Sequence, residues 1–177
     1  MQDPTEVTYT AVGAEIAFTY TFDQDTDLVG YSTLRMWVEA RGSQDMDLFV
    51  RLDKLGTDGS LLSPIALGNP VQGSSGQLRV SHRALDPVRS TLSEPFHTHD
   101  GEDLLHPGEI VPVDLGIWAT GLRFHAGERL KLTISGDRII PAELNMPSKR
   151  PLRNEGTHVI HVGGGRESYL LVPLAHP

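Results

Sequence analysis

Residues Thr33–Leu52 read TLRMWVEARGSQDMDLFVRL, and they carry two alternating patterns joined by an acidic link. Every second residue is apolar from Leu34 to Ala40, and again from Leu48 to Leu52. Successive side chains of a β-strand point to opposite faces, so each half predicts a strand with one face in a core and one wetter face. The stretch therefore predicts two strands joined by a turn, and it indicates an all-β protein.

The same period of two recurs along the chain, whereas no window of a dozen residues shows a helical stripe. Turn sequences such as His106-Pro107-Gly108 and Ala126-Gly127-Glu128 separate the patterns. Many short strands with frequent turns are typical of an antiparallel sandwich or barrel. The further expected strands are 15–22, 77–82, 110–115, 129–134, 157–162 and 168–174, with short helical turns near 81–86.

Three segments have the composition of long loops: Ser60–Gly76, Asp86–Asp103 and Arg138–Gly156. Loops of this length are uncommon unless they bind or contact something. The sequence contains no internal repeat and no low-complexity linker, so residues 1–177 are expected to form a single domain.

The composition excludes several classes of function. There is no cysteine, which rules out disulfides, thiolate metal sites and a cysteine nucleophile. The net charge of −8 argues against nucleic acid or an anionic membrane as a partner. The longest apolar stretches have the length of a strand, and the first ten residues, MQDPTEVTYT, lack the features of a signal peptide. We expect a cytoplasmic protein without a membrane span and without a cofactor.

Common catalytic motifs are missing from the sequence. There is no Gly-x-Ser-x-Gly nucleophile elbow, and Gly73-Ser74-Ser75-Gly76 has the wrong spacing. The glycines Gly163–Gly165 lie between two expected strands, whereas a dinucleotide site would need a helix after them. No catalytic residue is predicted in this chain.

The histidine-rich stretch His97-Thr98-His99-Asp100 is a candidate metal site. In an extended segment His97 and His99 point the same way, so both imidazoles could reach one ion. A distant third ligand would be His158 or His161. The alternative is a polar loop that bonds to its neighbours, and it is preferred because no strand period flanks the segment.

The two aspartates of the acidic link, Asp45 and Asp47, would share one side of an extended chain. Two carboxylates alone make a poor calcium site, because that ion takes six to eight oxygen ligands. We expect Asp45 to accept backbone N–H bonds in a turn. Asp47 is expected to begin the next strand and to pair with Arg35 or Arg51.

Nine short strings occur in one order and resemble a known family. They resemble the C-terminal domain of X-Pro dipeptidyl-peptidase and cocaine-esterase-type (CocE/NonD) hydrolases, from about Val7 to Pro173. The family often has a proline where this chain has Ala119, which is a minor difference in a turn. The strings are Asp27–Tyr31, Leu34–Val38, Asp45–Val50, Gly76–Arg83, Pro107–Val113, Ile117–Gly121, Phe124–Leu132, Asn154–His158 and Ser168–Pro173.

The resemblance implies a jelly-roll β-sandwich of the galactose-binding-domain-like kind. In such enzymes this domain follows an α/β-hydrolase domain that carries the Ser-His-Asp triad, packs on it and helps to wall the active-site cleft. None of the triad motifs matches a position of this sequence. The resemblance thus implies a non-catalytic C-terminal accessory domain, whose partner is a hydrolase domain of the same polypeptide, with self-association as a further possibility.

Two other hypotheses compete with this one. The first is a free-standing carbohydrate-binding module with a similar jelly roll, in which Trp37 or Trp118 would stack on a sugar. The second is a small metal-dependent enzyme that uses His97 and His99. The accessory-domain hypothesis predicts an exposed apolar surface, and it places the basic loop Arg138–Gly156 opposite the hydrolase domain. The expected interface residues are His97, His99, Arg138, Lys149, Arg150 and Arg153.

Overall fold

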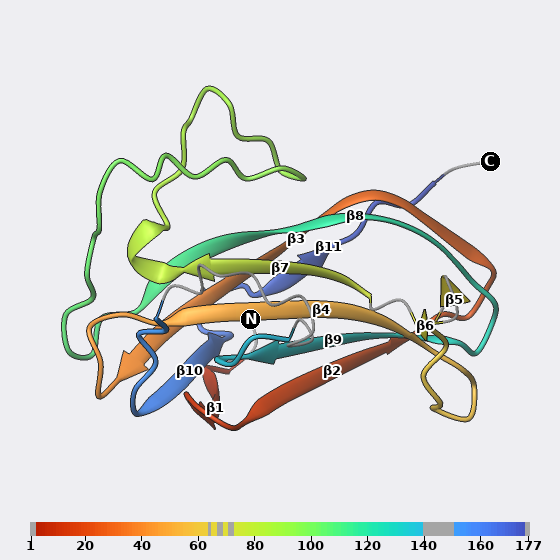
Figure 1. Ribbon diagram of the computed structural model, residues 1–177, viewed down its shortest axis with the longest axis horizontal. Helices are drawn as coiled ribbons and strands as arrows, with labels where there is room; N and C mark the ends of the chain where they lie inside the picture. Colours follow the sequence, from red (N-terminus) through yellow and green to blue (C-terminus); the bar gives the residue numbers. More distant parts are fainter. Residues whose placement is uncertain (1–2, 64, 67–68, 71–72, 140–150, 176–177) are drawn as a thin grey trace.

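Two antiparallel sheets pack face to face in the computed structural model (Figure 1). The structure describes residues 3–63, 65–66, 69–70, 73–139 and 151–175. This arrangement of two antiparallel sheets confirms the predicted all-β jelly-roll sandwich. The described part of the chain contains no helix with the length and apolarity that a membrane crossing requires.

The first sheet is built around β3, Thr26–Arg41, which is the longest strand. Strand β8 (Val111–Phe124) pairs with one edge of β3 over most of its length. The other edge of β3 pairs first with β11 (Tyr169–Leu171) and then with β10 (Thr157–Val162). Strand β1 (Thr5–Thr10) pairs with β10 and completes the sheet.

The second sheet has the order β2-β9-β4-β7. Its strands are β2 (Glu15–Thr21), β9 (Arg129–Ser135), β4 (Asp47–Leu55) and β7 (Ser74–Arg79). The chain leaves β7 directly into a short 3-10 helix, η1 (Val80–His82). A separate pair, β5 (Ile65–Ala66) and β6 (Asn69–Pro70), lies between β4 and β7 in the sequence.

The alternating residues of the sequence fill the space between the sheets. The four alternating apolar residues from Leu34 to Ala40 are buried, as are those from Leu48 to Leu52. The same is true of Val111, Val113 and Leu115, and of Leu130, Leu132 and Ile134. The period of two therefore predicted the core face of each of these strands correctly.

The outer face of β4 differs from the prediction, because its side chains are shielded from solvent. Phe49 and Asp53 point away from the core and are nonetheless buried. Strand β4 lies between β9 and β7, the Arg138 guanidinium lies 5.7 Å from the Phe49 ring centroid, and Arg51 pairs with Asp53 at 2.7 Å. Side chains from neighbouring residues thus cover this face, which the sequence pattern alone does not reveal.

Several boundaries also differ from the prediction. The strand expected at 77–82 is shifted to Ser74–Arg79, because the chain turns into η1 at Val80. The strand expected at 168–174 is shorter, and β1 was not among the expected strands.

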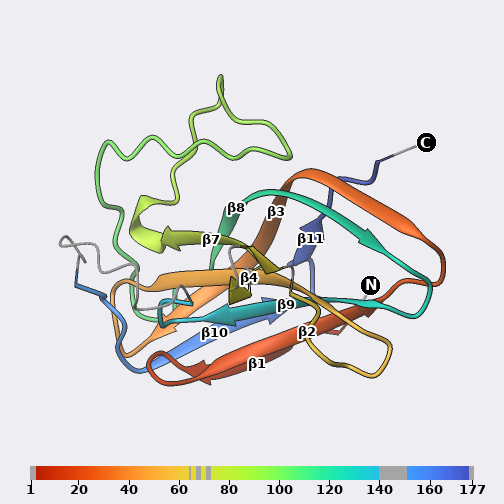
Figure 2. The same ribbon diagram turned by 45° about the vertical axis from the view of Figure 1, so that its right-hand side comes forward.

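The two sheets approach most closely where β7 passes β8. A Cβ atom on Gly76 would lie 2.2 Å from the carbonyl oxygen of Gly116, so only glycine fits there. The long loop between β7 and β8 extends beyond the sandwich at this edge (Figures 1 and 2). Its base is held by the hydrogen bonds Asp86 N–H to Phe96 O, 2.8 Å, and Thr98 N–H to Ala84 O, 3.0 Å.

Candidate functional site

The aspartates of the acidic link bind other parts of the chain. Arg79 Nε donates to Asp47 Oδ1 at 2.8 Å, and Arg79 Nη2 donates to Asp47 Oδ2 at 2.9 Å. The predicted pairing of Asp47 with Arg35 or Arg51 is therefore wrong. Arg79 is the direct cross-strand neighbour of Asp47, whereas Arg35 lies in the other sheet.

Asp45 is a buried acceptor, as expected, and its partners reach further than one turn. Its Oδ1 accepts the backbone N–H of Met46 at 2.9 Å and that of Ser81 at 3.0 Å. Its Oδ2 accepts the Ser81 hydroxyl at 2.8 Å and the Arg153 guanidinium at 3.3 Å. Asp45 thereby ties the acidic link to η1 and to the segment that precedes β10.

Asn154 completes this polar cluster and was not identified from the sequence. Its side-chain oxygen accepts the Asp47 N–H at 2.7 Å, and its Nδ2 donates to the Asp47 carbonyl at 3.1 Å. The Arg153 N–H also donates to Asp47 Oδ2 at 2.7 Å. A single asparagine carries no spacing pattern, so only the fold reveals that it pairs with the backbone of β4.

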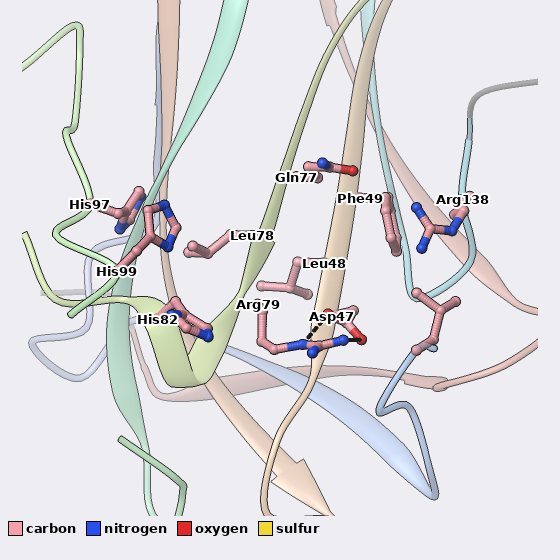
Figure 3. A pocket seen from close by; sticks show the side chains of 11 residues that line it. Asp47, Leu48, Phe49, Gln77, Leu78, Arg79, His82, His97, His99 and Arg138 are labelled. Carbon is pink, nitrogen blue, oxygen red and sulfur yellow. Dashed lines mark hydrogen bonds and ion pairs between the residues drawn. The ribbon is translucent and has the colours of Figure 1, made fainter. Parts of the chain in front are cut away.

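A hollow of about 640 Å³ opens on the outer face of the second sheet, beside this cluster (Figure 3). We call it the β4–β7 hollow. Histidines from η1 and from the β7–β8 loop lie on one side, and Arg138 and Phe49 lie on the other. The lining residues are Asp47, Leu48, Phe49, Gln77, Leu78, Arg79, His82, His97, His99, Arg138 and Leu152.

Three imidazoles gather at the edge of the hollow. The ring centroids of His97 and His99 are 5.9 Å apart, and those of His82 and His99 are 5.3 Å apart. His82 was not predicted, because only η1 brings it to the loop. The third ligand proposed from the sequence is wrong: His158 bonds to Tyr9 in the core, and His161 bonds to Glu39 in the first sheet.

The environment of the three histidines is only partly polar. Burial, and then the neighbouring His99, lower the pKa of His97. The Nδ1 atoms of His82 and His97 are buried and find no hydrogen-bond partner in the described residues. His99 has φ 53°, a left-handed conformation that is uncommon outside glycine.

The described residues do not place a third histidine or acid with His97 and His99 in the way that a metal ion requires. The group whose ligand atoms all lie within 4.8 Å of one another is Glu6, Glu39 and His161. Arg41 donates to both of these glutamates at 2.9 Å, so a guanidinium already offsets part of their charge and occupies their oxygens. This group is thus an ion-pair network.

The structure places the expected interface residues in different surroundings. His97, His99 and Arg138 line one hollow. Arg153 lies next to it, and its guanidinium donates to Glu102 at 2.7 Å and to Asp45. Lys149 and Arg150 lie outside the described residues.

The two tryptophans lie on the outer face of the first sheet. Trp37 is half-buried and pairs across strands with Pro112, whereas the Trp118 side chain is 73% exposed. Of the two tryptophans, Trp118 is thus the one whose ring is open to water.

Comparison with solved structures relates this fold to larger hydrolases. A CocE/NonD family hydrolase from Staphylococcus aureus, known from two structures, matches with a TM-score of 0.90 and 34% identity, over 98% of this chain and 33% of that one. An alpha-amino acid ester hydrolase shares the fold at 15% identity, covering 91% of this chain and 25% of that one, with a TM-score of 0.60. An aminopeptidase from a marine sediment Thaumarchaeota archaeon does so at 12%, covering 92% and 26%, with a TM-score of 0.57.

A comparison with curated proteins finds no significant match. The family model of the X-Pro dipeptidyl-peptidase C-terminal non-catalytic domain matches residues 13–171. This match runs from β2 to β11, so it includes every strand of the two sheets except β1, together with the β4–β7 hollow and the β7–β8 loop. The chain therefore belongs to the family of X-Pro dipeptidyl-peptidase C-terminal non-catalytic domains.

Proposed function

We propose that this chain is the C-terminal part of a serine hydrolase and that it packs on an α/β-hydrolase domain, where it helps to wall the active-site cleft. One observation carries the proposal. The chain matches the staphylococcal hydrolase over 98% of its own length but only 33% of that chain. The remaining length of such a relative offers room for a catalytic domain. The substrates would be esters, or peptide and amide bonds such as those that follow an X-Pro dipeptide.

The histidine chemistry of the described residues supports a non-catalytic role. The imidazoles of His125, His158 and His161 bond to Asp25, Tyr9 and Glu39, respectively. Tyr9 is the hydroxyl in this set, and burial raises its pKa, so it stays protonated and is a poor nucleophile. These bonds hold strands together and do not activate a nucleophile.

The β4–β7 hollow is the surface that we assign to the catalytic domain. Its rim combines the imidazoles of His82, His97 and His99 with the Arg138 guanidinium. Imidazole and guanidinium N–H groups are hydrogen-bond donors, and a facing domain could supply carboxylate acceptors for them. Arg153 already bonds to Glu102 and Asp45 within the chain, so we assign it to positioning this rim.

A free-standing carbohydrate-binding module is the second candidate, and the exposed Trp118 favours it. A water-exposed aromatic ring is what such a module needs for stacking. An apolar interface with another domain leaves the same ring exposed when that domain is absent, so Trp118 alone does not separate the two functions. The family membership favours the accessory domain.

Hydrogen exchange tests the docking role in the intact hydrolase and in the 177-residue chain. Peptides that cover residues 97–103 and 138–156 should exchange more slowly in the intact enzyme. Equally fast exchange in both samples would contradict docking through this surface. Peptides from the turn at 125–128, which precedes β9 and lies at the opposite end of that strand from Arg138, serve as the internal control.

An activity assay tests the assignment of catalysis to the other domain. The 177-residue chain alone should not hydrolyse a chromogenic acetate ester or an Ala-Pro anilide. The intact enzyme should hydrolyse at least one of them. Turnover by the isolated chain that a serine-directed phosphonate abolishes would contradict the proposal.

A further inference from the structure

The outer face of the first sheet carries a strip of exposed apolar side chains. We call it the Trp118 strip, and it comes from three strands. Its members are exposed in the following fractions: Val29 62%, Tyr31 43%, Trp118 73%, Tyr169 44% and Leu171 37%. Large exposed apolar groups that gather on one face usually mark an interaction surface.

The strand register explains why these residues share a face. Val29 and Tyr31 alternate with Leu28 and Ser32, which are buried, so they point away from the core. On the neighbouring strand β11, Leu171 pairs with Thr33, which lies two residues beyond Tyr31 on the same face. Tyr169 continues the row opposite Arg35.

Alternation along β8 places Trp118 on this face, because Leu115 and Ile117 are buried on the core side, and a β-bulge sets it opposite Tyr31. Gly30 pairs with Thr120, whereas Ser32 pairs with Ile117, so Trp118 and Ala119 of β8 both lie opposite Tyr31. Bulges re-aim side chains and often occur next to functional surfaces. The Trp118 ring is thereby presented to solvent beside Tyr31, although Ile117 next to it is buried in the core.

The surroundings of the strip contain few polar side chains. On β8 its neighbours are Gly116, Ala119 and Gly121, which have no hydrogen-bonding side chain. At one end, Arg35 and Asp114 neutralise each other in an ion pair of 2.6 Å, and at the other end Asp27 pairs with Arg123 at 3.2 Å. A sugar site needs polar groups placed beside the aromatic ring to recognise hydroxyls. This strip suits an apolar protein surface better than a sugar.

The β7–β8 loop extends the same surface. Its Pro95 packs over Gly116, because a Cβ atom there would lie 3.4 Å from Pro95 Cγ. Earlier in the same loop, Val88 is 89% exposed and Leu92 is 81% exposed. The loop that brings His97 and His99 to the β4–β7 hollow therefore also reaches the outer face of β8. The hollow and the strip lie on either side of one edge of the sandwich.

We propose that the Trp118 strip packs against the catalytic domain of the same polypeptide, with Trp118 as the anchor of the interface. This inference rests on the proposed function and adds a second contact surface to it. Tryptophan is prominent among the residues whose truncation weakens interfaces most. A domain tethered in the same chain is present at an effective concentration of about millimolar, which favours it over a second copy.

Tryptophan oxidation followed by mass spectrometry tests the proposal, because the chain contains only Trp37 and Trp118. The intact hydrolase and the 177-residue chain are treated with the same dose of N-bromosuccinimide. Trp118 should be oxidised at least tenfold more slowly in the intact enzyme. Trp37 is half-buried and serves as the internal reference in both samples.

A matched pair of variants tests the role of the anchor in the intact enzyme. Trp118→Asp and Val12→Asp each place a charge at an exposed apolar position, and Val12 lies in the β1–β2 turn. After the connection between the domains is cut by limited proteolysis, the wild-type fragments and the Val12→Asp fragments should co-elute in size exclusion. The Trp118→Asp fragments should separate, with at least a tenfold weaker association.

The outcomes distinguish this inference from the proposed function. If the wild-type fragments already separate, the docking role itself fails. If they co-elute while Trp118 stays as reactive as in the isolated chain, only the strip assignment is overturned. Protection of Trp118 in the isolated chain would also overturn the strip assignment. Protection that rises with protein concentration would indicate a second copy of the chain. Protection that requires added oligosaccharide would indicate a sugar ligand.

Discussion

Arg79 and Asp47 are direct partners across strands β7 and β4, and two hydrogen bonds of 2.8 and 2.9 Å join their side chains. Both groups are largely shielded from water. Asp47 also accepts the Arg153 N–H, so the pair connects the second sheet to the segment before β10. This ion pair holds one wall of the β4–β7 hollow in place.

Removing one partner of this pair should destabilise the domain strongly. Among the described residues, Asp47→Ala leaves the Arg79 guanidinium with the Pro151 carbonyl, at 2.9 Å, as its hydrogen-bond partner, and it frees the Arg153 N–H. Loss of one partner from a buried ion pair costs about 3–5 kcal/mol. Urea denaturation followed by circular dichroism measures the change in the free energy of unfolding.

Arg123→Ala is the matched control, because the Arg123–Asp27 pair is exposed. Exposed pairs contribute about 0–1 kcal/mol, so this variant should remain close to the wild type. If Asp47→Ala lost no more than Arg123→Ala, the Asp47 cluster would not be holding the sheet and its loops together.

Much of the fold could be predicted from local pattern. The alternation from Leu34 to Ala40 depends only on the geometry of a strand and on which face meets the core. The outer face of β4 could not be predicted in the same way. Phe49 and Asp53 are covered by Arg138 and Arg51, and the position of Arg138 depends on how β9 lies beside β4.

The candidate site depended more on tertiary structure. Pairing of Asp47 with Arg79 requires the register of two strands that a long connection separates. His82 joins His99 only because η1 turns the chain after β7. The sequence did single out His97 and His99, since their spacing is local. Continued through Ile117, the alternation of β8 places Trp118 on the outer face, but alternation alone does not indicate whether other side chains cover that face.

Leu132→Ala tests the core of the second sheet. Leu132 is buried between its cross-strand neighbours Leu52 and Phe18. Large-to-small changes at such positions cost about 2–5 kcal/mol. Thermal and chemical unfolding measure the loss, and Val12→Ala at an exposed turn is the control. A change within about 0.5 kcal/mol at Leu132, as is usual for surface sites, would contradict its place in the core.

Gly76→Ala tests the close approach of β7 and β8. The added methyl group would meet the Gly116 carbonyl oxygen and the Leu115 side chain, so the strands must separate. Overpacking of this kind costs about 1–3 kcal/mol. Gly121→Ala is the control, because a Cβ atom there meets nothing within 4 Å. Equal free energies of unfolding for the two variants would show that the sheets do not touch at this point.

His158 should make the stability depend on pH. It is fully buried, its Nδ1 lies 3.0 Å from the Tyr9 hydroxyl, and its Nε2 finds no partner among the described residues. Burial lowers the pKa of His158 to about 4. The unfolded chain, with an ordinary histidine pKa near 6.5, therefore binds a proton that the folded chain excludes between these two values.

The sign of the effect follows from this difference. The contribution of neutral His158 to the free energy of unfolding is fully present above about pH 6.5. It is lost as the pH falls toward 4, by an amount on the order of 3 kcal/mol. Urea midpoints measured at several values across this window would show the slope. His158→Gln should flatten it, whereas His106→Gln, which replaces an exposed histidine, should leave it as in the wild type. An unchanged slope in His158→Gln would mean that another group excludes the proton.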